Sequence, residues 1–130
     1  MTHISPLRWA LALAGLLAAT PVLAQDAGDA TAGANVFKKC KSCHQVGEGA
    51  KNGIGPELNN VMGREIGSVP GFKYSKALQP TGEVWDATSL GAFLANPKTA
   101  RPGSKMTFAG LKSEADIADV LAYLASASGS

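Results

Sequence analysis

Apolar side chains recur at helical spacing near the C-terminus of the chain. They stand three or four residues apart, which brings side chains to one face of a helix, at Ile117, Val120, Leu121 and Leu124. Ser113 precedes Asp116 by three residues, a pair typical of a capped helix N-terminus. The pattern predicts a helix that begins after Ser113 and frays near Ser126.

A second helix is predicted over residues 88–96. Its apolar positions are Leu90, Phe93 and Leu94. Asp86 or Thr88 can cap its start, because a short polar side chain accepts hydrogen bonds from the first free amides. Pro97 ends it, since the residue before a proline is restricted to extended conformations.

A third helix is predicted from about Ala30 to about His44. Phe37, Cys40 and Cys43 follow one another at intervals of three residues and share one side of it. These three helices are the only regular elements that the pattern predicts, apart from a short helical turn at 75–79. The expected fold class is therefore all-α.

The middle of the chain has little periodicity. Residues 45–86 hold eight glycines and three prolines, and a loop is also expected over residues 98–108. So long a stretch without regular structure is uncommon in a compact domain, and a domain of this size buries only a modest core. A large, flat, apolar cofactor can supply the missing interior, with the loops wrapped around its edge.

The pentapeptide Cys40-Lys-Ser-Cys-His44 indicates which cofactor this is. Cys-x-x-Cys-His is the attachment signature of a c-type haem. Two thiols three residues apart can each form a thioether with one vinyl group of the porphyrin, and the adjacent imidazole then reaches the iron. The sequence therefore predicts one covalently bound haem c, with Cys40, Cys43 and His44 in its site.

Other uses of a Cys-x-x-Cys pair fit less well. A redox dithiol of the thioredoxin kind is expected beside a βαβ unit, and a zinc site needs four ligands. The chain has only two cysteines, and its other histidine is His3. A plain disulfide would give His44 no role.

Residues 1–24 are predicted to be a cleaved signal peptide. A single Arg8 precedes an apolar run of about 11 residues, which ends in small residues before Gln25. A spanning helix needs about 20 apolar residues, although a retained anchor stays an alternative. The domain is then residues 25–130, and the expected location is the periplasm.

A haem iron with one histidine needs a sixth ligand or keeps an open position. Met62 lies 18 residues after His44, whereas Met106 lies 62 residues away, behind a Pro-Gly turn. That turn can aim a side chain at the far face of the ring. The spacing favours Met106 but leaves Met62 as an alternative.

From about Ala32 to Ala125 the chain resembles the small soluble class I cytochromes c. Motifs of that family occur in order along the chain. They are Gly33…Phe37-Lys-Lys-Cys40-x-x-Cys43-His44, Gly55-Pro56-Glu-Leu58, Gly63-Arg64, Pro70-Gly-Phe-Lys-Tyr-Ser75, Trp85, Phe93-Leu-x-Asn-Pro-Lys98, Pro102-Gly-Ser-Lys-Met-x-Phe-Ala-Gly110 and Leu121-Ala-Tyr-Leu124.

The resemblance implies a fold and a set of site residues. The N- and C-terminal helices would cross at Gly33, and long loops would wrap the haem. Met106 would be the second iron ligand beside His44, and the carbonyl of Pro56 would hold the imidazole. Four further residues would lie at the haem propionates or near the methionine loop, namely Arg64, Tyr74, Trp85 and Ser104. Phe93 and Leu78 replace a tyrosine and an asparagine that many relatives have.

The function implied is that of a one-electron carrier rather than an enzyme. Two strong ligands leave no position for oxygen or peroxide, and a His/Met pair raises the potential. The alternative is a haem enzyme or gas sensor with a labile sixth ligand. Expected partners are redox proteins, such as a cytochrome bc-type complex, an oxidase, a reaction centre or a periplasmic dehydrogenase.

The charge of the chain says little about which class of partner it binds. The formal net charge of +2 gives no reason to expect nucleic acid. Lys38, Lys39 and Lys41 flank the haem motif and can steer docking if they share a face with other lysines. We expect a monomer that meets the membrane only through its partners.

Overall fold

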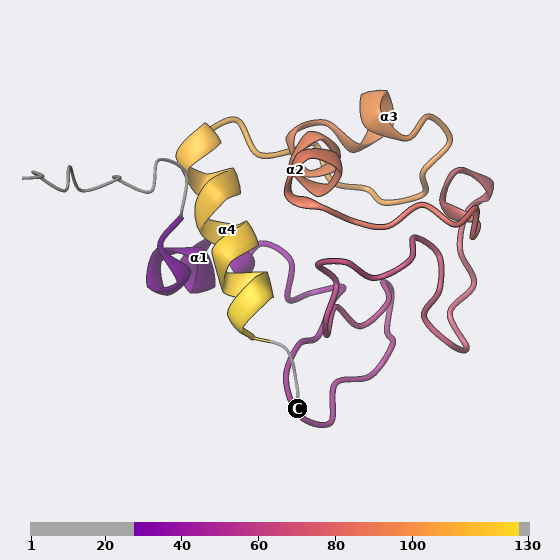
Figure 1. Cartoon of the computed structure of the whole chain (residues 1–130), viewed down its shortest axis with the longest axis horizontal. Helices are drawn as coiled ribbons and strands as arrows, with labels where there is room; N and C mark the ends of the chain where they lie inside the picture. Colours follow the sequence, from indigo (N-terminus) through magenta and orange to yellow (C-terminus); the bar gives the residue numbers. More distant parts are fainter. Residues whose placement is uncertain (1–27, 128–130) are drawn as a thin grey trace, which may run out of the picture.

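The computed structural model describes residues 28–127, and regular structure in this part of the chain is helical (Figure 1). The elements are α1 (Ala30–Phe37), the 3₁₀ turn η1 (Lys76–Leu78), α2 (Ala87–Ala95), α3 (Pro97–Ala100) and α4 (Glu114–Ser126). Extended pairing within residues 28–127 is limited to one isolated antiparallel bridge between Glu65 and Val84. The predicted all-α class is confirmed, whereas the predicted signal peptide, 1–24, lies outside the described residues.

Helices α1 and α4 pack closely across each other, as Figure 1 shows. A Cβ atom at Gly33 would lie 1.9 Å from the carbonyl oxygen of Asp119 and 2.7 Å from the Cβ of Tyr123. Only glycine therefore fits at this crossing. One turn further along α1, the ring of Phe37 lies 5.2 Å from that of Tyr123, measured between centroids.

Side-chain caps set the starts of the three longer helices. Asp29 accepts hydrogen bonds from the amides of the first turn of α1, and Ser113 accepts one from Asp116 in α4. At α2 the cap is Asp86 rather than Thr88: its carboxylate accepts from the Ser89 amide, while the Ser89 hydroxyl accepts from the Asp86 amide. The bond from the Ser89 amide to the carboxylate is the main cause that holds the pKa of Asp86 below its usual value.

The predicted first helix is too long at its C-terminal end. Regular helix stops at Phe37, and residues 38–43 form turns. The amides of Lys38, Lys39 and Cys40 bond to carbonyls three residues back, so the chain tightens as it leaves the helix. The haem motif lies in this tight turn rather than in α1.

The predicted loop over residues 98–108 is also wrong at its start. Asn96 and Pro97 end α2 as expected, but they also begin α3. The Asn96 side chain accepts a hydrogen bond from the Thr99 amide, and Pro97 occupies the first helical position, where its missing N–H costs nothing. The predicted turn at 75–79 is confirmed as η1.

Short polar links organise the loops between α1 and α2. Asn52 accepts from the amide of Glu57 and donates to the carbonyl of Pro70. The segment before α2 is held by three backbone bonds, from Gly63 N to Trp85 O, from Trp85 N to Arg64 O and from Ile66 N to Glu83 O. No helix within residues 28–127 is long and apolar enough to cross a membrane.

The crossing at Gly33 can be tested against a matched glycine. Gly33→Ala should lower the free energy of unfolding by about 1–3 kcal/mol, because backbone must move to admit the methyl group. At Gly91, inside α2, a Cβ would meet only side-chain atoms at 3.6 and 3.7 Å. Gly91→Ala should therefore raise it by about 0.5–1 kcal/mol. Denaturant unfolding of the two variants checks this, and equal effects would contradict the close crossing.

Candidate functional site

A cavity of about 460 Å³ lies between α1, α2, α4 and the loops. Its volume falls within the roughly 300–1,000 Å³ of small-molecule and cofactor pockets. Eight of the nine site residues expected from sequence line it, namely Cys40, Cys43, His44, Pro56, Arg64, Tyr74, Trp85 and Met106. Ser104 is not among the lining residues.

The haem motif forms one turn at the cavity wall. The amides of Cys43 and His44 both bond to the carbonyl of Cys40, at 3.1 and 2.9 Å. Both thiols are free in the described chain. Burial, and then the neighbouring Cys43, raise the pKa of Cys40. A raised pKa keeps the Cys40 thiol protonated, whereas the attacking thiol of a redox dithiol has a lowered pKa.

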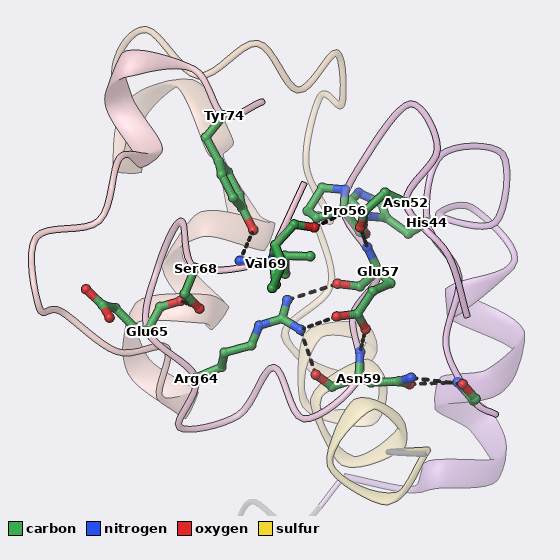
Figure 2. Close-up of polar contacts among 12 residues, drawn as sticks. His44, Asn52, Pro56, Glu57, Asn59, Arg64, Glu65, Ser68, Val69 and Tyr74 are labelled. Atoms are coloured by element: carbon green, nitrogen blue, oxygen red, sulfur yellow. Dashed lines mark hydrogen bonds and ion pairs between the residues drawn. The ribbon is translucent and has the colours of Figure 1, made fainter. Parts of the chain in front are cut away.

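His44 is held from two sides. Its Nδ1 donates to the carbonyl oxygen of Pro56 at 2.7 Å, a contact drawn in Figure 2. Gly55 lies against the ring, because a Cβ there would come within 2.3 Å of the His44 Cε1. Burial is the main cause that lowers the pKa of His44. The neutral ring with its proton on Nδ1 offers the Nε2 lone pair to a metal.

The two candidate methionines differ in position. Met106 lines the cavity, and its amide donates to the Ser104 hydroxyl at 3.4 Å. This bond gives Ser104 a role in the turn before the methionine. Met62 packs against the core and is absent from the cavity lining.

Arg64 has protein partners that sequence did not predict. Its guanidinium pairs with the Glu57 carboxylate at 3.1 Å and donates to the carbonyls of Asn59 and Glu57, at 2.6 and 2.9 Å (Figure 2). Glu57 lies in a loop without periodicity, so only its place beside Pro56 could have marked it. The negative charge of Glu57 already neutralises the positive charge of Arg64. Arg64 therefore attracts a further acidic group less strongly.

Three polar groups at the cavity fit an acidic ligand. The Tyr74 hydroxyl accepts from the Val69 amide at 3.1 Å, which leaves its own hydrogen to donate. Trp85 and Ser75 are buried residues that line the same cavity, and their indole N–H and hydroxyl groups are donors. These three donors at one cavity suit the carboxylates of a cofactor.

Other possible sites lack this combination. A larger surface hollow of about 650 Å³ lies over residues 50–70, but neither cysteine nor His44 lines it. No group of three or more histidine, cysteine, aspartate or glutamate side chains within residues 28–127 is arranged to hold a metal.

Comparison with known proteins gives one consistent family. The family described as Cytochrome c matches residues 30–128. The chain belongs to this family. A cytochrome c2 of Rhodomicrobium vannielii is 49% identical over 119 residues, 92% of this chain and 95% of that protein. A cytochrome c-550 of Ancylobacter novellus is 56% identical over 95 residues, 71% and 89% of the two chains.

A solved structure agrees with the sequence comparison. Cytochrome cH from Methylobacterium extorquens has a TM-score of 0.69 and 43% identity, covering 75% of this chain and 97% of that one. As a cytochrome c, the protein carries a covalently bound haem c and transfers electrons. It is not an enzyme, and the alternative of a haem enzyme or sensor finds no support in these relatives.

The contact between Gly55 and the imidazole can be tested by adding one methyl group. Gly55→Ala should push the His44 ring away from the Pro56 carbonyl and lower the yield of haem-loaded protein severalfold. Gly53→Ala is the matched control, because a Cβ there would meet only the Cys43 carbonyl oxygen, at 3.6 Å. The measurement is haem absorbance per exported polypeptide. Equal yields from the two variants would contradict the proposed packing.

Proposed function

We propose that the chain is a periplasmic carrier of single electrons whose haem iron is held by His44 and Met106. The observation that carries the proposal is that Cys40, Cys43, His44 and Met106 line one mainly apolar cavity. When bound, the haem supplies a one-electron couple between ferrous and ferric iron. The two thiols would tether it, and the imidazole and thioether would complete the ligand set.

Residues around the cavity have supporting roles. The Pro56 carbonyl fixes the tautomer and the orientation of His44. Donors at Tyr74, Trp85 and Ser75 would receive the propionates. The apolar lining excludes water and disfavours the extra charge of the ferric state, which together with a thioether ligand favours a high potential.

The mouth of the cavity supports docking to acidic partners. Lys39, Lys73 and Lys105 are exposed and line it, and Glu65 is the one acidic residue among the lining side chains. Beside them Ile54 is 79% exposed. A cationic rim around an apolar contact fits transient binding to a redox protein with an acidic surface. Of the lysines that flank the haem motif, only Lys39 lines the mouth.

Export to the periplasm rests on the N-terminal sequence. Residues 1–24 have the charged start, apolar run and small-residue end of a signal peptide. We expect the complex that donates the electron and the complex that accepts it each to present an acidic surface to this protein.

The methionine ligand can be identified by paired variants. Met106→Ala should abolish the weak far-red band of the ferric protein and let the ferrous protein bind carbon monoxide at once, because an axial position opens. Met62→Ala should keep the band and stay unreactive. Absorption spectra of both purified holoproteins decide this. The opposite pattern would reassign the ligand, and carbon monoxide binding by the unaltered protein would overturn the carrier function.

The docking face can be tested by separating charge from apolar contact. Reduction by a solubilised cytochrome bc-type complex should slow as ionic strength rises. Lys73→Gln should lower the rate and flatten this salt dependence, whereas Ile54→Ser should lower the rate about fivefold without changing the slope, a loss of about 1 kcal/mol in apolar contact. Lys76→Gln, an exposed lysine outside the cavity mouth, is the control. A flat salt profile for the unaltered protein would contradict the proposal.

A further inference from the structure

We propose that Arg101 positions the methionine ligand by fastening the segment that carries Met106 to Glu83 and to Trp85 in the wall of the haem cavity. The inference rests on the proposed role of Met106. Arg101 follows α3 and precedes Met106 by five residues. Its guanidinium pairs with the Glu83 carboxylate at 2.5 Å and lies over the Trp85 ring, 5.6 Å from the centroid.

Packing and backbone hydrogen bonds hold the two residues that Arg101 contacts, Glu83 and Trp85, in place. Trp85 is only 8% exposed, and its ring packs on Phe93 of α2 with 5.2 Å between centroids. The backbone of Glu83 and Trp85 is bonded to residues 63–66 by the three hydrogen bonds described above. A side chain attached here is therefore attached to the core rather than to a mobile loop.

The methionine segment has few ties of its own. The Arg101 amide bonds to the Pro97 carbonyl, and the Ser104 amide bonds back to the Arg101 carbonyl. The next backbone–backbone hydrogen bond that joins this stretch to another element runs from Leu111 to Leu94. Met106 itself packs against the core, and the side chain of Arg101 is the ionic cross-link that joins the start of this segment to a loop 18 residues away in sequence.

Weakening this cross-link should make Met106 easier to displace. The ligand can leave the iron only if its segment moves, and a moving segment strains the contacts at its end. Arg101 is 24% exposed and Glu83 58% exposed, so each contact alone is weak. Because both contacts hold the same guanidinium, losing them together should change the equilibrium for displacement of Met106 severalfold.

The experiment titrates the ferric holoprotein with imidazole and follows loss of the far-red band. Arg101→Gln should lower the apparent dissociation constant of imidazole about fivefold, equivalent to about 1 kcal/mol. Glu83→Gln should lower it about twofold, since the contact with Trp85 remains. Arg101→Lys should fall between the unaltered protein and Arg101→Gln, because an ammonium keeps the charge but not the planar fork.

Two controls distinguish positioning from general effects. Lys98→Gln removes an exposed charge from α3 and should titrate as the unaltered protein does. The denaturant midpoint of Arg101→Gln should change little, because unfolding is governed by the core. An Arg101→Gln titration equal to that of Lys98→Gln, or a shift fully matched by lost global stability, would overturn the inference.

Failure of the Met106 assignment would look different. If Met106→Ala kept the far-red band, the proposed ligand and this inference would both fall. If Met106→Ala lost the band while every Arg101 variant titrated as the unaltered protein does, only the role of Arg101 would fall.

Discussion

The haem cavity and the hydrophobic core of this protein are one structure. Ten of the eleven buried apolar side chains within residues 28–127 form one cluster, and each of the ten also lines the cavity: Phe37, Val61, Ile66, Trp85, Leu90, Phe93, Leu94, Leu111, Val120 and Leu124. Protein interiors are close-packed, and a wall without atoms opposite it loses its dispersion contacts. The covalent haem therefore completes the core, and the helices have little to pack around without it.

This constraint explains a fold with so little regular structure. The crossing of α1 and α4 at Gly33 closes one side of the shell, while α2 and the loops close the rest. The apolar faces of a porphyrin offer no hydrogen bonds, so most polar groups of the loops around it find partners within the loops. Asn52 links two loop segments in this way, and Arg64 serves Glu57 and two carbonyls at once.

Sequence predicted what depends on short-range chemistry. Periodicity and caps predicted α2 and α4, and the pentapeptide predicted the cofactor. The family resemblance predicted most of the residues that line the cavity. The end of α1 and the start of α3 were missed because each depends on local backbone geometry that several sequences can satisfy. Pairs such as Arg64 with Glu57 and Arg101 with Trp85 join separate loop segments, and no periodic pattern marks them.

The two proposed ligands differ in how they are held. His44 is fixed by the turn of its own motif, by the Pro56 carbonyl and by contact with Gly55. Met106 follows a turn whose firm attachments are at its ends. A carrier needs both ligands in place in both redox states, because any rearrangement slows electron transfer. The firmly held His44 therefore fixes the ligand geometry on its side of the haem. The contacts at the ends of the methionine segment determine whether Met106 stays in place when the charge on the iron changes.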